Sequence, residues 1–270
     1  MSKSFILRTI TFLVAAPIVW GIAYYGGLLF LAMVLILALF SLNEFYNLML
    51  KKKYFPAYWV GNVMTIFFIV FSYYSVSRNW EPAQSAILTI AASLALMAGI
   101  FLKRAEDTIV DVAVTLLGMI YIGWFFSYFL LIRNLTAHGG YLFFLIFTVW
   151  AMDIVAYIVG KKFGRHKLAP AISPNKTWEG AIAGFITAII AAEIFSGVAL
   201  VNGTHAIILG GIIGIVAQLS DLVESVIKRD AHVKDSGDIV PGHGGVLDRI
   251  DSFILTAPIM YYYVVWAILR

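Results

Sequence analysis

The chain has 270 residues, of which 61% are hydrophobic and only 13% are charged, and its mean hydropathy is +0.91. This composition excludes an ordinary soluble domain and a disordered chain, and it predicts a protein largely surrounded by lipid. The net charge of +4 does not require a nucleic-acid partner, because basic loops beside a membrane give the same excess. Cysteine is absent, which excludes disulfides and thiolate ligands.

Nine apolar segments follow one another, and each approaches the length that a helix needs to cross a bilayer. They span residues 9–25, 27–50, 56–77, 84–102, 108–132, 140–160, 178–201, 205–227 and 252–269. Their apolar runs do not alternate with polar residues, which favours helices over barrel strands. The first segment has some features of a signal peptide, but no small-residue cleavage motif precedes a polar start, so an uncleaved helix is favoured. We therefore predict an all-α polytopic integral membrane protein with about nine transmembrane helices.

The distribution of charge predicts the orientation of these helices. With nine helices, the side of the membrane that holds the N-terminus would carry 16 of the 19 Lys and Arg residues. Because positive loops favour the cytoplasm, we expect a cytoplasmic N-terminus and an external C-terminus. Only Glu44 and Glu81 are acidic before residue 105, so we predict transmembrane scaffold helices in 1–105 and a catalytic region in 106–270. Glu44 itself is assigned no role.

The densest polar stretch covers residues 220–252. Its first part has side chains spaced as on one helix face: Asp221, Glu224, Ser225 and Lys228. Asp248 and Asp251 repeat the offset of three, so we expect a second helix that also presents two carboxylates at the same membrane surface. Carboxylates in membrane helices bind ions or pair with one another, and clustered hard oxygens suit Mg²⁺.

These carboxylates have two interpretations. In the first, one or two Mg²⁺ ions are bound by the acidic residues of both pairs: Asp221, Asp248, Asp251 and Glu224. In the second, the carboxylates pair with nearby basic side chains and bind no metal; the candidates are Lys228, Arg229 and Arg249.

A glycine-rich segment, residues 241–245, lies between the two acidic pairs. Consecutive glycines let backbone N–H groups approach an anion, and His243 can donate to a phosphate or transfer a proton. A plain turn is the alternative interpretation. The acidic residues on both sides and the basic residues nearby, including Lys234, favour a metal–phosphate site.

A second informative stretch runs from Asp153 to Gly180. Ser173, Asn175 and Lys176 precede an apolar helix, where they could grip a phosphate or a nucleotide. Thr177 as an N-cap, followed by an acidic residue in the first turn, is the structural alternative. The basic residues at 161–167 could attract an anionic lipid head group, or they follow the cytoplasmic bias of positive charge.

A resemblance to the phosphatidate cytidylyltransferases, also called CDP-diacylglycerol synthases, is carried by one long run. It reads Ser225-x-Ile227-Lys228-Arg229-x4-Lys234-Asp235-x-Gly237-x3-Pro241-x-His243-Gly244-Gly245-x2-Asp248-Arg249-Ile250-Asp251. The upstream pattern Asp153…Tyr157…Gly160 and Ser173-Pro174-x-Lys176-Thr177-x-Glu179-Gly180 is similar to that family too, and also to polyprenol and phytol kinases. Val240 stands where the family has a bulkier apolar residue.

The resemblance implies that CTP and phosphatidic acid give CDP-diacylglycerol and pyrophosphate with Mg²⁺ at the cytoplasmic face of a bacterial inner membrane. The implied partners are CTP, phosphatidic acid and membrane lipid, without nucleic acid, and a homodimer is among the oligomeric states left open. From the residue patterns and the resemblance together, we expect these catalytic residues: Asp221, Lys228, Arg229, His243, Asp248 and Arg249. We expect these substrate-binding residues: Ser173, Asn175, Lys176, Ser225, Lys234, Asp235, Gly244 and Gly245.

Three other activities remain as alternatives. A CTP-dependent lipid-alcohol kinase shares the upstream motif but would transfer the γ-phosphate. A CDP-alcohol phosphotransferase is also an Asp-rich membrane enzyme, but its glycine after the first aspartate is absent here, because Leu222 follows Asp221. An ion-coupled transporter would use intramembrane carboxylates as the coupling site.

Overall fold

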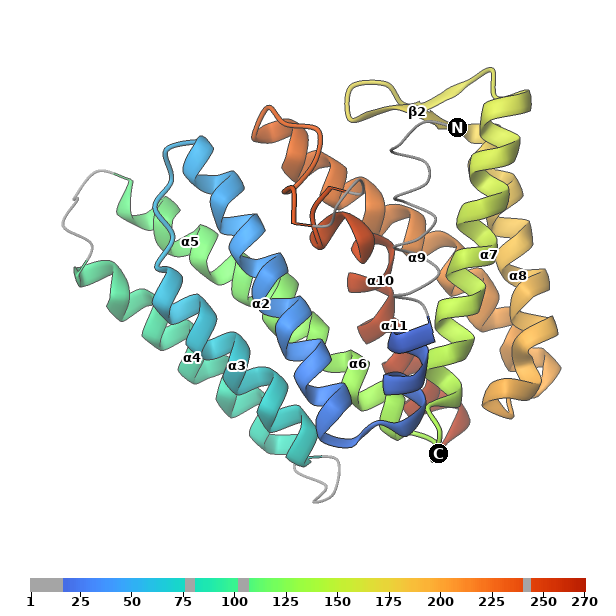
Figure 1. Ribbon diagram of the computed structural model, residues 1–270, viewed down its shortest axis with the longest axis horizontal. Coiled ribbons are helices and arrows are strands. Elements are labelled where there is room, and N and C mark those ends of the chain that lie inside the picture. Colours follow the sequence, from blue (N-terminus) through green and yellow to red (C-terminus); the bar gives the residue numbers. More distant parts are fainter. Residues whose placement is uncertain (1–16, 76–80, 102–106, 240–243) are drawn as a thin grey trace. The chain divides into compact units, whose positions relative to one another are not determined.

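The computed structural model describes residues 17–75, 81–101, 107–239 and 244–270, most of which are helical (Figure 1). The chain divides into two compact units, which are described separately here. The first unit comprises Met1–Asn134 with Ala231–Ile250, and the second comprises Leu135–Asp230 with Asp251–Arg270. This division is one of contacts, and the functional division expected at residue 105 stays a prediction.

The first unit is built from antiparallel helices around an aromatic core. After the helical residues 17–25, its helices are α2 (Gly27–Lys51), α3 (Tyr58–Ser75), α4 (Glu81–Phe101), α5 (Thr108–Gly118) and α6 (Phe125–Asn134). A π-helical turn over Met119–Trp124 joins α5 to α6. Helix α2 packs against α3, α5 and α6, and α3 packs against α4. The fully buried Tyr46 donates a hydrogen bond of 2.9 Å from its hydroxyl to the carbonyl of Thr115, which fixes α2 against α5.

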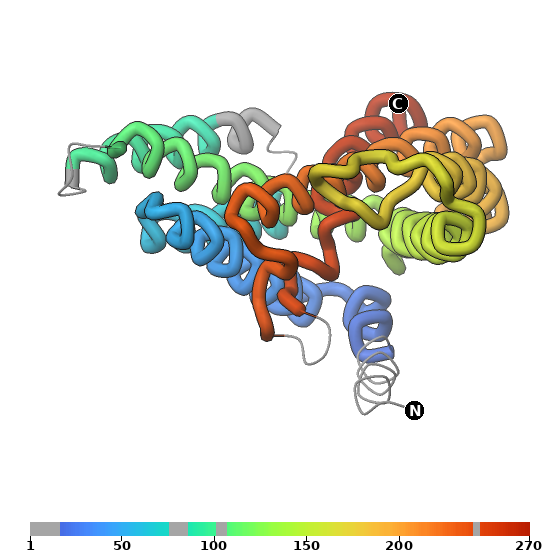
Figure 2. The backbone as a smooth tube through the Cα atoms, turned by 90° about the horizontal axis from the view of Figure 1, so that it is seen from above, coloured from blue at the N-terminus to red at the C-terminus, as the bar shows by residue number. Residues whose placement is uncertain are grey.

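The second unit is a bundle of three long helices with short elements at their ends. It contains α7 (Gly140–Phe163), β1 (Lys167–Ala169), β2 (Ser173–Thr177), α8 (Trp178–Ala199), α9 (Gly203–Asp230), α10 (Asp251–Ile254) and α11 (Thr256–Tyr263). Helix α8 packs against both α7 and α9, and Figures 1 and 2 show the three side by side. Small residues allow this approach: a Cβ added at Gly180 would lie 2.7 Å from the carbonyl oxygen of Ala156.

A short antiparallel hairpin follows α7 and was not expected. The sequence indicated a helix end at Lys161 and Lys162 followed by a basic loop, but β1 and β2 pair within that segment, with Lys167 opposite Thr177 and Ala169 opposite Ser173. Strands of five or fewer residues that lack alternating apolar residues are hard to predict from a sequence. The hairpin matters because β2 carries the polar residues that were predicted to bind substrate.

Six helices within the described parts of the chain are long and apolar enough to cross a membrane. They are Gly27–Lys51, Thr108–Asn134, Gly140–Phe163, Trp178–Ala199, Gly203–Asp230 and Asp251–Ile268. Large apolar side chains such as Ile109 and Leu200 are each 86% exposed. Such exposure is unfavourable in water but favourable in contact with lipid. The prediction of an all-α membrane protein is therefore confirmed, and the apolar segments from residue 27 onward coincide with helices to within a few residues.

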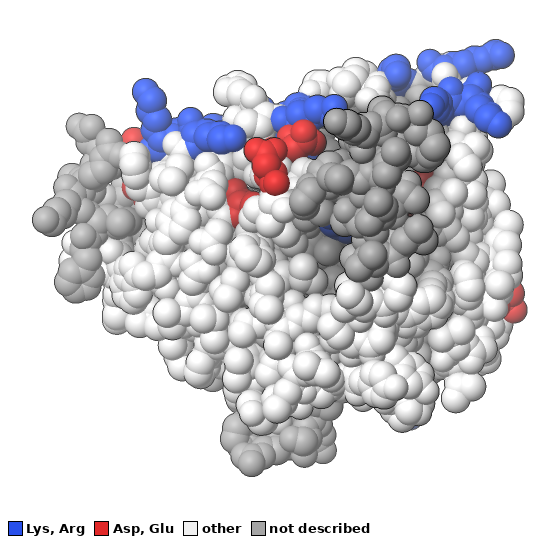
Figure 3. Space-filling view, viewed as in Figure 1, with Lys and Arg blue, Asp and Glu red and all other residues white. Residues whose placement is uncertain are grey.

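Charge lies at the ends of the helices rather than along their sides. On the face shown in Figure 3, most of the visible Lys and Arg side chains of each unit gather at one end, and the helix sides below them carry few charges. In the second unit this end carries the hairpin and the C-terminal turn of α7, which ends with Lys161 and Lys162.

Candidate functional site

One face of α9 carries the polar residues whose helical spacing was noted in the sequence. The hydroxyl of Ser225 donates to Oδ1 of Asp221 at 3.4 Å, one turn away. Glu224 is fully buried and forms an ion pair with the Nζ of Lys228, one turn further on. The prediction that these four side chains share one helix face is confirmed by these contacts.

Two further aspartates interact with Asp221 from other helices of the second unit. Asp153 on α7 and Asp251 at the start of α10 both lie close enough to Asp221 for their charges to repel it. Ser252, which follows Asp251, also lies near Asp153. We call Asp153, Asp221 and Asp251 the acidic cluster. Three helices that are far apart in the sequence thus bring their carboxylates into one region.

The second unit supplies two ammonium groups to this region. Lys176 on β2 forms an ion pair with Asp221, with 2.7 Å between Nζ and Oδ2, and both side chains are partly exposed to solvent. Lys228, which pairs with Glu224, also attracts Asp251. Counted as ionised, the acidic cluster and Glu224 have four negative charges against these two positive ones. Carboxylates therefore outnumber the two ammonium groups in this region.

The acidic cluster has the donor chemistry of a hard-cation site. Carboxylate oxygens from three helices are the ligands that Mg²⁺ and Ca²⁺ prefer. Within the described residues, no three His, Asp or Glu side chains converge closely enough to hold a metal ion between them. In this arrangement the cation in contact with Asp221 is the ammonium of Lys176.

The hairpin is fastened to α9 and α8 by polar contacts. The Nε of Arg229 donates to the carbonyl of Ile172 at 3.0 Å, so this guanidinium bonds to the turn between β1 and β2. Thr177 caps α8 by accepting the N–H of Gly180 at 3.2 Å, and Glu179 accepts hydrogen bonds from His166. The structural interpretation of Thr177 and Glu179 is confirmed. Ser173 and Asn175 lie on β2 beside Lys176, where Asn175 is exposed.

In the first unit, Asp248 stabilises the segment that surrounds it. We call residues 231–250 the signature loop; residues 240–243 within it, including His243, lie outside the described residues. Oδ2 of Asp248 accepts hydrogen bonds from the amide and hydroxyl of Ser236 and from the amide of Gly245, each at 2.9 Å. The N–H of Gly245 therefore binds a carboxylate of its own loop. Gly244 has a φ of +84°, which favours glycine at this turn.

The expectation that Asp248 and Asp251 share one helix face is wrong. Asp248 lies in a 3₁₀ turn over Leu247–Arg249, whereas Asp251 is the first residue of α10. Ile250, with a φ of −126° and a ψ of 3°, interrupts the helix between them. The remaining predicted substrate and catalytic residues of this loop are exposed: Lys234, Asp235 and Arg249.

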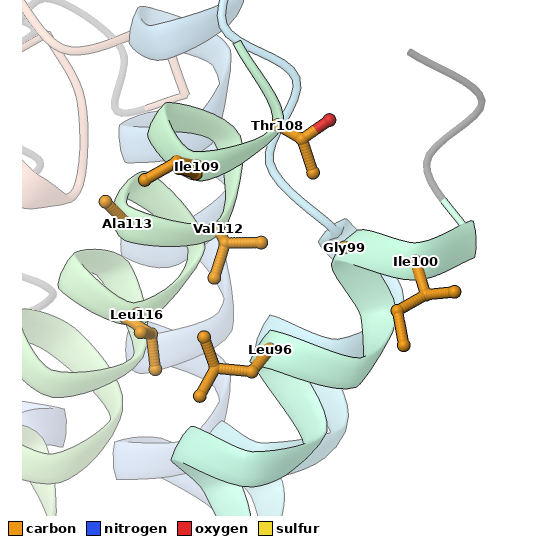
Figure 4. A pocket seen from close by; sticks show the side chains of 8 residues that line it. All are labelled: Leu96, Gly99, Ile100, Thr108, Ile109, Val112, Ala113 and Leu116. Atoms are coloured by element: carbon orange, nitrogen blue, oxygen red, sulfur yellow. The ribbon is translucent and has the colours of Figure 1, made fainter. Parts of the chain in front are cut away.

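A groove between α4 and α5 in the first unit has a different character. Its volume is about 450 Å³, and Figure 4 shows its apolar lining. The lining residues are Leu96, Gly99, Ile100, Thr108, Ile109, Val112, Ala113 and Leu116. Because none of them is charged, this groove lacks the chemistry needed to bind a triphosphate.

Comparison with known proteins identifies the family of this chain. A model of the cytidylyltransferase family matches residues 6–267. The chain belongs to this family. The phosphatidate cytidylyltransferase of Bacillus subtilis (strain 168) is 37% identical over 260 residues, which cover 94% of this chain and 96% of that protein. The phosphatidate cytidylyltransferases of Staphylococcus haemolyticus (strain JCSC1435) and Staphylococcus aureus (strain COL) are each 35% identical over 257 residues, with the same coverage.

Membership of the cytidylyltransferase family confirms two predictions from the sequence. The resemblance carried by residues 225–251 is correct, and so is the assignment of the chain to the nucleotidyltransferase enzymes. The roles of individual residues are not tested by this membership.

No role was assigned from the sequence to one residue of the acidic cluster or to the carboxylate of α2 that contacts the signature loop. Asp153 was noted only as part of a motif, and its late position in an apolar helix was the signal that it belongs with Asp221. Glu44 was left without a role, although it was an isolated carboxylate in a long apolar segment. Such a carboxylate needs a buried partner, but the sequence does not reveal which one.

Proposed function

We propose that this enzyme transfers the cytidylyl group of CTP to phosphatidic acid. An anionic oxygen of the phosphatidate phosphate attacks the α-phosphorus of CTP and forms a new P–O bond. The bond between that phosphorus and the oxygen bridging to the β-phosphate breaks, and pyrophosphate leaves with the electron pair. The attacking oxygen needs no deprotonation, so the protein's main tasks are to position the phosphates and to neutralise their charge.

The observation that carries this proposal is the ion pair between Lys176 and Asp221 beside the acidic cluster. A triphosphate approaching this site would meet an ammonium group that can exchange its carboxylate partner for a phosphate oxygen. We assign Lys176, Lys228 and Arg229 to neutralise phosphate charge, with Ser173 and Asn175 as nucleotide contacts. The names of relatives that span nearly the whole chain support cytidine and phosphatidate as the reacting partners.

We propose that Asp221 and Asp251, assisted by Asp153, hold one divalent cation. Their hard oxygen donors are of the kind that Mg²⁺ prefers, although the three side chains would have to move closer together to bind it. A Mg²⁺ ion bound there would neutralise charge on the triphosphate. Glu224, predicted as a fourth ligand, is buried against Lys228, so its contact supports a role in holding that lysine. The assignment of Asp248 as a metal ligand stays a prediction, as do the roles of His243 and Arg249.

We further propose the complete topology of nine spans, with the N-terminus and the reaction on the cytoplasmic side of a bacterial inner membrane. The concentration of 16 of the 19 basic residues on one side supports this orientation. A C-terminal fusion to a reporter that is active only in the cytoplasm should be inactive, while an N-terminal fusion should be active. An active C-terminal fusion would contradict the topology.

The proposed reaction is tested by following two labels of CTP. Purified protein in detergent–lipid micelles is given phosphatidic acid, Mg²⁺ and CTP labelled at either the α- or the γ-phosphate. Label from the α-position should enter the lipid fraction with an equal amount of pyrophosphate, and γ-label should stay in water. Transfer of γ-label to a lipid alcohol would favour the kinase alternative, and folded protein that transfers neither label would contradict the proposal.

A further inference from the structure

Glu44 is a buried carboxylate in the middle of an apolar helix. It lies on α2 in the first unit, and only 3% of its surface is exposed. A carboxylate in such a place is strongly unfavourable unless hydrogen bonds replace its lost water. The partners of Glu44 must therefore be important to the structure.

Those partners all come from the signature loop. Oε1 of Glu44 accepts the amide of Val246 at 2.9 Å, and Oε2 accepts the amide of Leu247 at 2.9 Å. The hydroxyl of Ser236 lies 3.0 Å from the same Oε2. One side chain of α2 thus binds both sides of a loop that lies about 200 residues later in the sequence.

Ser236 connects Glu44 to Asp248. Its hydroxyl lies 3.0 Å from Oε2 of Glu44 and 2.9 Å from Oδ2 of Asp248. A hydroxyl has a single proton, so it can donate to only one of the two carboxylates at a time. The position of Asp248 is therefore linked to that of Glu44 through one small side chain.

The glycines of the signature loop leave space for this arrangement. A Cβ at Gly245 would collide with both Ser236 and Glu44. A Cβ at Gly237 would lie only 2.8 Å from Oε1 of Glu44. The loop and the carboxylate thus fit one another closely on both sides.

A purely structural role is the main alternative, and Asp111 exemplifies it. Asp111 is 1% exposed and accepts the amide of Phe55 at 2.6 Å, so it is also a buried carboxylate bound to loop backbone. Glu44 differs in what it holds, because its loop carries Asp248 and Arg249, which the family signature includes. The two residues form a natural pair for comparison within one unit.

We propose that Glu44 is a positioning residue of the transfer reaction, which fixes the signature loop through Val246, Leu247 and Ser236. Glu44 itself touches no reacting atom. Its effect on catalysis rests on the proposed function, whereas its anchoring of the loop can be measured independently of any activity.

The test compares Glu44→Gln with Asp111→Asn. Each change keeps the side chain's size and removes its charge. In Glu44→Gln the new NH₂ group must also face a backbone N–H, because each oxygen of Glu44 accepts one, whereas Asn at position 111 can still accept the amide of Phe55. For Glu44→Gln we expect kcat to fall about 10- to 100-fold, the range found for groups that orient a catalytic residue. For Asp111→Asn we expect kcat within about twofold of wild type, at temperatures well below the Tm of each variant.

Hydrogen exchange supplies a readout that does not depend on catalysis. In Glu44→Gln the amides of Val246 and Leu247 should exchange faster, while peptides from α7 to α9 should be unchanged. In Asp111→Asn a neutral oxygen holds the amide of Phe55 more weakly than a carboxylate does, so a smaller rise in exchange should appear around Phe55 and not in the signature loop. Ser236→Ala provides a milder variant that should show the same loop footprint with a smaller fall in kcat.

The outcomes separate this proposal from the proposed function. If Glu44→Gln loses no more kcat than Asp111→Asn, or if exchange in the signature loop does not rise, the positioning role is wrong. If the wild-type chain transfers no cytidylyl group, the proposed function fails, and faster loop exchange in Glu44→Gln would still establish the anchor.

Discussion

The acidic cluster of the second unit and the Glu44 contacts of the first unit satisfy buried or partly buried carboxylates in different ways. Asp221 is balanced by Lys176, whose long side chain comes from a hairpin and remains partly exposed. Glu44 is balanced by two backbone amides and a serine, all within one loop. Side-chain ammonium groups can move away when a ligand arrives, whereas backbone amides move only if the loop does.

This difference indicates which carboxylates can take part in chemistry. A carboxylate held by a mobile cation can exchange that cation for a metal ion or release it to a phosphate. A carboxylate whose oxygens accept hydrogen bonds from backbone amides already has its partners, and it stabilises the fold. Asp248 combines both properties. Like Asp221 it has a predicted catalytic role, and like Glu44 it is bound by two backbone amides, which donate to its Oδ2.

The largest expected effect comes from removing the charge at the centre of the acidic cluster. Asp221→Asn should lower kcat about 10²- to 10³-fold, comparable to the loss of a single group that stabilises transition-state charge. The α-label assay measures this change, with Mg²⁺ varied in parallel. Glu193→Gln, which alters an acidic residue on α8 near Gly203, is the control and should keep near-normal turnover. Near-normal turnover of Asp221→Asn with unchanged Mg²⁺ dependence would contradict the assignment.

The buried pair of Glu224 and Lys228 should affect stability more than any other single contact in the second unit. Glu224→Gln removes the carboxylate that forms the ion pair with the buried ammonium of Lys228 and should destabilise the fold by about 3 kcal/mol. Thermal unfolding in detergent measures the effect as a lower Tm. The double variant Glu224→Gln with Lys228→Met should recover most of that loss, because the buried ammonium is removed together with its carboxylate. An unchanged Tm in the single variant would show that the pair contributes little.

Gly245→Ala tests how closely the signature loop fits against α2. The added Cβ would collide with Ser236 and Glu44, and such overpacking should destabilise the first unit by about 1–3 kcal/mol. Gly211→Ala is the matched control, because a Cβ there meets nothing within 4 Å and alanine favours the helix α9. If both variants unfold at the wild-type temperature, the loop can move away from Glu44 more easily than the contacts indicate.

The sequence predicted the helices well because long apolar runs have few other solutions in lipid. It also predicted the shared face of Asp221 and Lys228, since helical spacing alone decides that arrangement. It could not predict that Ile250 interrupts the helix before Asp251, because no proline or glycine marks the break. The contacts of Glu44 could not be predicted for another reason. They join residues about 200 positions apart, and local sequence patterns carry no information about such pairs.

The most direct test of the exchangeable ion pair is the affinity of the protein for Mn²⁺ without nucleotide. Electron paramagnetic resonance of free Mn²⁺ would compare wild type with Lys176→Met and with Lys167→Met, which loses the same charge from the exposed start of β1. Removing the ammonium that competes for Asp221 should tighten Mn²⁺ binding about tenfold, equivalent to about 1.4 kcal/mol, while Lys167→Met should change it much less. Unchanged or weaker binding in Lys176→Met would contradict the account, because the ion pair would then be structural rather than exchangeable.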